Sequence, residues 1–261
     1  MKLHHLVAAC VLLLLSWPAE AQEPLPSPPT SPQFLSRYNF HLGAAALANA
    51  DQRYSWDTHF GGEIDVVDYV AGRTTGIIDY QAVLGNEYRP FDPYQGNYIL
   101  EVATSYRARR TEVAAFFHHV SRHLSDRPKV IPVAWNILGV RVLRHAAFTN
   151  LSVDFVAELG GTTQRVNADY RWSGKADVTI RRPLSPRFGV FVHGVGQVTA
   201  VESGKPARGT QAGGVAEGGV RIHGEAGVAE FFAGFERRFD ADPLDFTAQR
   251  WFMVGFRVLR Y

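Results

Sequence analysis

The stretch from Phe116 to Asp126, FFHHVSRHLSD, gathers three histidines, two serines and an aspartate. Within it, His119 and Ser121 are two residues apart, which puts their side chains on one face of a β-strand and within reach of each other. A serine hydroxyl is a weak nucleophile until a base takes its proton, and imidazole is the usual base. If the stretch is a strand, the pair predicts a serine nucleophile, Ser121, with His119 as its base.

A serine–histidine pair usually needs a third polar group that orients the imidazole. The next apolar segment begins at Trp135, and Asn136 falls on the face opposite Arg141. A hairpin between the two segments would bring Asn136 near His119 and Ser121, so the predicted catalytic set is His119, Ser121 and Asn136. The alternative is a network of polar side chains that bind one another and water where a strand ends.

Metal binding by the histidines is not expected. His119 and His123 are four residues apart, which in a strand is about 13 Å, too far for one ion without a bulge. We therefore expect neither a metal nor another cofactor.

Alternation of apolar and polar residues runs through nearly the whole chain and predicts strands. Between Tyr98 and Arg109, for example, Leu100 and Val102 share one face while Glu101 and Arg107 share the other. Twelve strands are predicted, at residues 39–49, 54–68, 72–84, 97–108, 111–123, 134–145, 148–159, 165–181, 187–201, 211–223, 225–238 and 248–261.

Two architectures produce such alternation: a soluble sheet with its apolar face on a core, and a transmembrane barrel with its apolar face in lipid. Strands of about ten residues, aromatic residues near strand ends, and tight links alternating with long ones favour the barrel. The predicted fold is an all-β, antiparallel transmembrane β-barrel of about twelve strands with periplasmic termini. A soluble secreted β-sandwich that serves as a binding module is the alternative.

The polar faces of these strands would line the lumen of a barrel. Arginine and glutamate both recur there, so they could filter small polar solutes in a narrow channel or fill the lumen with salt bridges. The predicted lumen-lining residues are Glu101, Arg107, Glu112, Arg141, Asp154, Glu158, Glu217, Arg221, Glu230 and Glu236.

The ends of the chain indicate export. Residues 1–21 have a basic head, an apolar run and an Ala-x-Ala ending, which predicts a cleaved signal peptide that carries the only cysteine, Cys10. Residues 22–37 are a Pro-rich tether, and 38–261 form the barrel domain. The net charge of +2 gives no indication of nucleic-acid binding.

The last strand, closing on Tyr261, resembles the C-terminal assembly signal of bacterial outer-membrane proteins. That resemblance implies a location in the bacterial outer membrane, contact with its lipids, and insertion by the barrel assembly machinery. The sequence leaves the oligomeric state open.

The His-x-Ser pair with a strand-borne asparagine resembles the outer-membrane phospholipase A family, twelve-stranded barrels that carry these groups on the lipid-facing wall. His119, Ser121 and Asn136 match, whereas the Ser-Asn-Gly of that family is Ser121-Arg122-His123 here, and no clear acidic loop site for calcium is present. The pair is also similar to that of the lipid A 3-O-deacylases. These resemblances imply a lipid-acting serine hydrolase.

A longer match is to an uncharacterised bacterial envelope family, domain of unknown function 1207. The corresponding positions are His119, Ser121, His123, Leu124 and Asp126. This resemblance implies an outer-membrane-type barrel without an established activity. Three functions therefore stay open: a barrel of uncharacterised role that forms a narrow channel, a lipid-acting serine hydrolase, and a soluble binding module.

Overall fold

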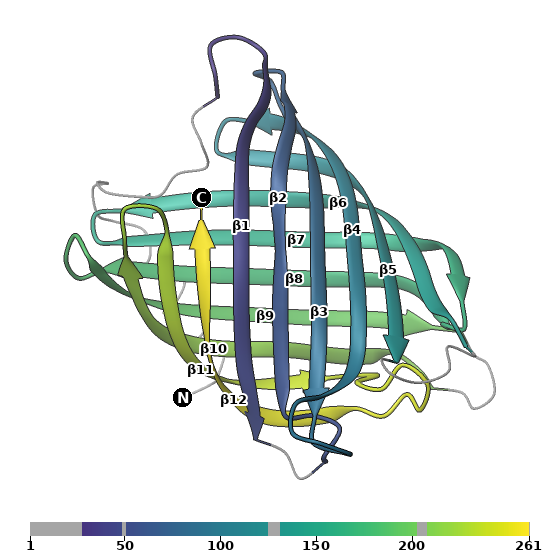
Figure 1. Ribbon diagram of the computed structural model, residues 1–261. Helices are drawn as coiled ribbons and strands as arrows, with labels where there is room; N and C mark the ends of the chain where they lie inside the picture. The colour runs from purple at the N-terminus through teal and green to yellow at the C-terminus, as the bar shows by residue number, and fades with distance from the viewer. Residues whose placement is uncertain (1–27, 49–50, 125–130, 203–207, 261) are drawn as a thin grey trace, which may run out of the picture.

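The computed structural model describes residues 28–48, 51–124, 131–202 and 208–260 of the chain. These residues form a closed barrel of twelve antiparallel strands, in which each strand pairs with its neighbours in sequence and β1 pairs with β12 (Figure 1). The strands are β1 (Gln33–Ala48), β2 (Trp56–Asp68), β3 (Arg73–Gly85), β4 (Asp92–Ala108), β5 (Thr111–Leu124), β6 (Val133–Phe148), β7 (Leu151–Val166), β8 (Tyr170–Pro183), β9 (Phe188–Val201), β10 (Gln211–His223), β11 (Val228–Arg238) and β12 (Gln249–Arg260). The predicted twelve-stranded barrel is confirmed, and the β-sandwich alternative is wrong, because the first strand closes on the last.

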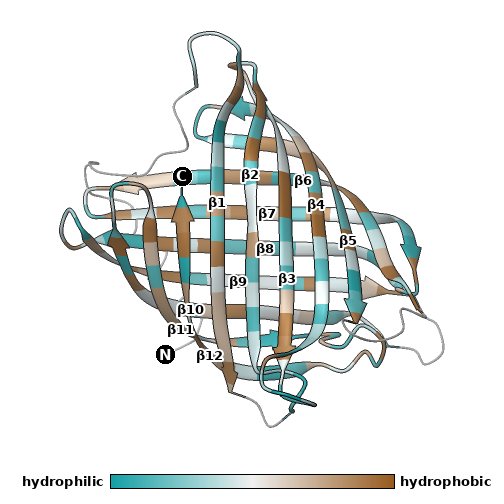
Figure 2. Cartoon of the chain, in the orientation of Figure 1, coloured by the Kyte–Doolittle hydropathy of each residue, from teal (hydrophilic) through white to brown (hydrophobic). Residues whose placement is uncertain are grey.

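The alternating polar and apolar residues of each strand face the inside and the outside of the barrel, respectively (Figure 2). In β4, Glu101 is 5% exposed whereas its neighbour Val102 is 58% exposed, and the same contrast recurs along β12 between buried Trp251 and exposed Phe252. Because successive side chains point to opposite faces of a strand, the charged residues line the interior and the apolar residues cover the outer wall.

The barrel begins earlier than predicted. β1 starts at Gln33, inside the segment 22–37 expected to be a tether, because its first residues pair with the end of β2, as in Gln33↔Asp68 and Arg37↔Asp65. The expected domain start at residue 38 is therefore too late. The predicted signal peptide, 1–21, and Asp126 lie outside the described residues.

The boundary between β7 and β8 also differs from the prediction. β7 continues to Val166, and β8 starts only at Tyr170, whereas a strand was expected over 165–181. Residues 160–164 lack apolar alternation, yet they extend the ladder with β6 through a bulge beside Asn136. Backbone hydrogen bonding thus continues where the side-chain pattern stops.

The two ends of the barrel differ. We call the end that holds the start of β1, the end of β12 and the links β2–β3, β4–β5, β6–β7, β8–β9 and β10–β11 the short-turn end. The opposite end, which holds the other links, is the long-loop end. At the short-turn end, Gly72 leaves no room for a side chain, since an added Cβ would lie 1.9 Å from the carbonyl oxygen of Ser105.

The link between β11 and β12 folds into the barrel at the long-loop end, where Asp240, Ala241 and Asp242 are almost fully buried. Arg122 of β5 donates hydrogen bonds of 2.7 Å to the carbonyl oxygens of Asp240 and Ala241. Tyr170 of β8 donates to the Asp240 carboxylate at 2.8 Å. We call Asp240–Asp242 the loop plug, because side chains from several strands hold it across the mouth.

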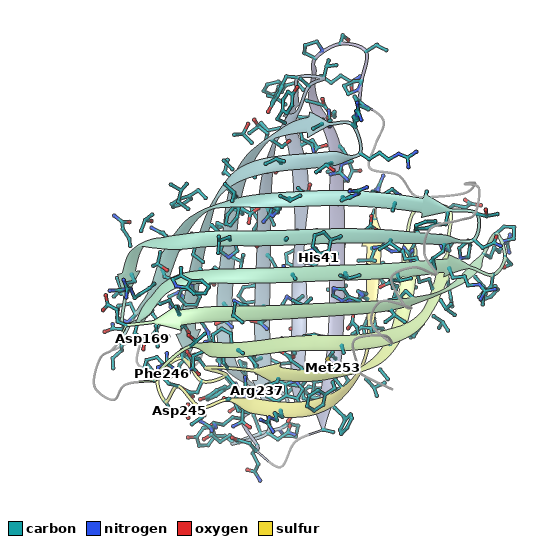
Figure 3. All side chains as sticks on the ribbon, turned by 180° about the vertical axis from the view of Figure 1, so that it is seen from behind. His41, Asp169, Arg237, Asp245, Phe246 and Met253 are labelled. Carbon is teal, nitrogen blue, oxygen red and sulfur yellow. The ribbon has the colours of Figure 1, made fainter. Side chains whose placement is uncertain are left out.

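The outer part of the same link binds its neighbours as well. Asp169, Asp245 and Phe246 gather at the long-loop end (Figure 3), where Arg208 forms an ion pair of 2.6 Å with Asp169 and lies over the Phe246 ring. In the β1–β2 link, Arg53 reaches the Asp245 carboxylate at 3.1 Å and also holds Asp51, whose pKa its hydrogen bond lowers. Charged contacts therefore connect the β11–β12 link to several of its neighbours at the long-loop end.

Candidate active site

The predicted catalytic residues lie on the outer face of the hairpin β5–β6, near the long-loop end. In β5, inward residues such as Phe116 and Val120 are buried, while His119 and Ser121, on either side of Val120, take outward positions. The register pairs His119 directly with Asn136 of β6. The hairpin therefore brings Asn136 to the histidine as expected.

His119 and Asn136 form one polar unit. The Nδ1 atom of His119 lies 2.6 Å from the Oδ1 atom of Asn136, and the Asn136 side-chain amide donates to Gln164 of β7 at 2.9 Å. Because that amide oxygen can only accept, Nδ1 of His119 donates the hydrogen bond, so that in the neutral form of the ring Nε2 is the acceptor. A neutral imidazole held in this tautomer is what a general base requires.

Ser121 bonds to a different histidine from the one predicted. Its hydroxyl oxygen lies 2.8 Å from Nε2 of His123, two residues further along the same outer face. His123 in turn packs edge-on against the ring of Tyr98, with ring centroids 5.7 Å apart. The structure thus brings His119 of β5 to Asn136 of β6, and Ser121 to His123 along the outer face of β5.

His123 is the residue that sequence reasoning missed as a partner of Ser121. The signal was present, because the spacing His119-x-Ser121-x-His123 puts all three side chains on one strand face. Gln164 was missed for another reason. It lies in the stretch without alternation, and only the bulge in β7 brings it opposite Asn136.

The surroundings of this polar group are apolar and aromatic. Tyr98 pairs with Ser121 across the β4–β5 ladder, and Tyr80 lies beside Tyr98 with centroids 5.1 Å apart. Toward the middle of the wall, Phe117 and Leu138 are exposed on the outside. A row of hydrogen-bonded polar groups therefore sits between tyrosines and an apolar belt, as at the border between lipid tails and head groups.

The ten predicted lumen-lining residues take positions on the inner face, and each forms an ion pair there. In the middle of the barrel, Arg141 binds Glu101 through two hydrogen bonds of 2.6 and 2.7 Å and Glu158 through one of 2.8 Å. Further ion pairs of this set are Arg221–Glu230, Glu217–Arg257, Glu236–Arg238, Asp154–Arg181, Arg107–Asp68 and Glu112–Arg73.

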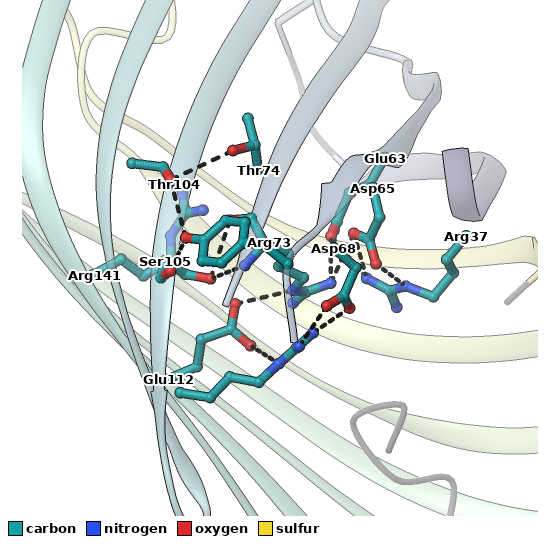
Figure 4. Close-up of polar contacts among 12 residues, drawn as sticks. Arg37, Glu63, Asp65, Asp68, Arg73, Thr74, Thr104, Ser105, Glu112 and Arg141 are labelled. Atoms are coloured by element: carbon teal, nitrogen blue, oxygen red, sulfur yellow. Dashed lines mark hydrogen bonds and ion pairs between the residues drawn. The ribbon is translucent and has the colours of Figure 1, made fainter. Parts of the chain in front are cut away.

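A cluster of linked ion pairs lies inside the barrel toward the short-turn end (Figure 4). Arg73 lies between Asp65 and Glu112, at 2.9 Å from each, and Arg37 binds Asp65 at 3.1 Å and Glu63 at 2.9 Å. Between this cluster and the loop plug, the lumen holds a cavity of about 690 Å³. Sequence patterns predicted charged residues inside but not which of them meet.

Among the described residues, no group of three His, Cys, Asp or Glu side chains is placed to hold a metal ion. In the same part of the chain, no helix is long and apolar enough to cross a membrane.

Solved structures with the same architecture are outer-membrane proteins. The outer membrane phospholipase A from Escherichia coli superposes with a TM-score of 0.52 at 11% identity, covering 87% of this chain and 98% of that one. The chain has an outer-membrane β-barrel fold. The Salmonella typhi outer membrane phospholipase, solved as a dimer with bound calcium, gives a TM-score of 0.51 at 11% identity, covering 93% of this chain and 94% of that one.

At these identities the likeness establishes the barrel fold alone. No protein-family model matches the chain, so the resemblance to the uncharacterised envelope family has no further support, and no curated protein matches it either.

Proposed function

We propose that the chain is an outer-membrane serine hydrolase that cleaves carboxylic esters of membrane lipids. The observation that carries the proposal is the His119 imidazole on the outer wall, whose Nδ1 lies 2.6 Å from the Asn136 side-chain oxygen, with Ser121 at the next outward position of β5. Polar groups that face lipid are costly to bury unless they are hydrogen-bonded, and they tend to serve a function there.

The outer-membrane barrel fold and the signal peptide expected at residues 1–21 support the proposed location. A signal peptide would deliver the chain to the periplasm, and the barrel assembly machinery would insert it with its termini on the periplasmic side. The long-loop end would then face outward, and His119, Ser121 and Asn136 would lie at the level of the outer leaflet. The ester bonds of lipids lie at this depth, between head groups and tails.

The proposed mechanism uses His119 as the base. Rotation of the Ser121 side chain to another staggered rotamer turns its hydroxyl from His123 toward Nε2 of His119, which Asn136 holds free to accept a proton. As the proton passes to His119, the serine oxygen attacks the ester carbonyl carbon and forms an acyl-enzyme. The protonated His119 returns the proton to the departing alcohol, and water then releases the fatty acid by the same steps.

Separate substitutions of the two histidines test these roles. We expect His119→Gln to lower kcat for ester hydrolysis about 10²- to 10⁴-fold, the usual contribution of a general base, and His123→Gln to lower it less than tenfold. Fatty-acid release from phospholipid micelles by the refolded mature protein measures both. The opposite order would assign the base to His123 and contradict the role of the His119–Asn136 pair.

A narrow channel is the second candidate, and the cavity in the lumen is the observation in its favour. Against it, Asp240 and Ala241 occupy the outer mouth, and the ion pairs of Arg73 cross the other end. We therefore expect the wild-type barrel to give no sustained conductance in planar lipid bilayers. A steady, ohmic conductance would favour the channel instead.

A further inference from the structure

A second feature of the outer wall lies next to the proposed active site. Leu138 and Val140 of β6, Leu159 of β7 and Trp172 of β8 form the walls of a groove of about 460 Å³. We call it the outer groove. It opens to the outside of the barrel, and the side chains that line it are carbon throughout, apart from the indole nitrogen of Trp172.

The groove exists because one outward position has no side chain. Gly161 pairs with Leu138 on one side and with Trp172 on the other, so it lies at the centre of a row across three strands. A Cβ built on Gly161 would have no atom within 4 Å. The recess is therefore open space, bounded on both sides by large apolar side chains.

The position of the groove relates it to the catalytic residues. Asn136 and Leu138 are consecutive outward residues of β6, which places them about 6.6 Å apart along the strand. β6 starts at the long-loop end, so the groove runs from the His119–Asn136 pair toward the middle of the barrel wall. The outer side of the wall at this depth meets the hydrocarbon of a bilayer.

We infer that the outer groove binds the acyl chain of the substrate, so that the enzyme acts on esters of long-chain fatty acids. This inference rests on the proposed function, because it places the ester carbonyl at Ser121 and lets the chain extend past Leu138 over Gly161. The occupant is a lipid acyl chain, since the groove is apolar, faces the lipid side and starts at Leu138, which lies one outward position from Asn136 and about 13 Å along the strands from Ser121.

Filling the groove tests the inference. Gly161→Leu is expected to reduce kcat/KM for a C16 p-nitrophenyl ester at least tenfold while leaving the C4 ester within twofold, because only the long chain needs the recess. Gly196→Leu is the matched control. Gly196 is an exposed outward glycine of β9 with nothing within 4 Å of an added Cβ, so its substitution should change neither rate.

A binding measurement separates failure of the inference from failure of the proposed function. The measurement uses the Ser121→Ala protein and a palmitate brominated on its chain, present at low mole fraction in detergent micelles. The fluorescence of Trp172 is obtained as the difference between this protein and the same protein with Trp172→Phe. We expect the brominated palmitate to quench that fluorescence. Gly161→Leu should at least halve that quenching, and Gly196→Leu should not. Equal quenching in Gly161→Leu and Gly196→Leu would overturn the inference that the groove binds the acyl chain. An unchanged ratio of C16 to C4 rates in an active Gly161→Leu enzyme would overturn it as well. Absence of hydrolysis by the wild type would overturn the proposed function alone.

Discussion

Replacement of Ser121 by alanine is expected to abolish release of fatty acid from mixed phospholipid and lipid A micelles, with a loss of at least about 10³-fold. The reason is that Ser121 supplies the oxygen that forms the acyl-enzyme, and no other group replaces it in that step. The two imidazoles remain in the variant, with His119 still bound to Asn136. Folding should be unaffected, since the serine lies on the outer face and makes one side-chain hydrogen bond.

Thr104→Ala is a suitable control for this loss. Thr104 carries an outward hydroxyl on β4 near the short-turn end, where it contacts the hydroxyl of Tyr69 at 3.2 Å. Its removal should leave hydrolysis unchanged, with or without added calcium. Equal rates for the wild type and Ser121→Ala would show that the polar row is only a network at the border of the membrane.

Replacement of Arg73 by methionine is expected to give the largest loss of stability, about 3 kcal/mol in the free energy of unfolding. Its side chain is 5% exposed and lies between the carboxylates of Asp65 and Glu112, which are 2% and 5% exposed. Methionine fills a similar volume but leaves both carboxylates without their shared cation. Removing one partner of a buried ion pair lowers the free energy of unfolding by more than the intact pair contributes, because the other charge stays buried without its partner.

Denaturant unfolding in detergent micelles, followed by the shift in gel mobility on heating, measures this effect. Arg89→Met is the matched control, because the Arg89 side chain, which pairs with Asp92, is 63% exposed, in contrast to the buried Arg73. That variant should stay within about 1 kcal/mol of the wild type. If Arg73→Met and Arg89→Met both unfold at the same denaturant concentration as the wild type, the ion-pair cluster at the short-turn end does not stabilise the barrel.

Strand number and the inner and outer faces could be predicted from sequence because each strand has one lipid-type face and one charged face. Glu101 beside Val102 is a clear case, and the structure buries one and exposes the other. The strand ends were less predictable. Gln33 and the stretch up to Val166 are strand because their backbones pair with a neighbour, which side-chain alternation does not report.

The loop plug was not predicted either. In the sequence, Asp240 and Asp242 look like ordinary loop carboxylates. In the structure, Arg122 and Arg208 hold Asp240 and Arg53 pairs with Asp242 at 3.3 Å, and these arginines come from distant parts of the chain. Such contacts arise only when the barrel closes and brings these strands around one mouth.

One part of the candidate site could also be predicted from the sequence, and another part could not. The pairing of His119 with Asn136 was predictable, because a hairpin fixes which outward residues meet. The bond from Ser121 to His123 depends on side-chain rotamers, and the outer groove depends on the register that puts Gly161 between Leu138 and Trp172. Neither rotamer nor register can be obtained from residue types alone.

Covalent labelling of the mature protein tests the central claim most directly. The folded barrel in micelles is treated with a long-chain alkyl fluorophosphonate, and its peptides are then mapped by mass spectrometry. We predict a single stoichiometric adduct on Ser121 whose formation slows strongly in His119→Gln, because the base must activate the hydroxyl that attacks phosphorus. No adduct on Ser121, or one that forms at the same rate in His119→Gln, would contradict a serine hydrolase on the outer wall.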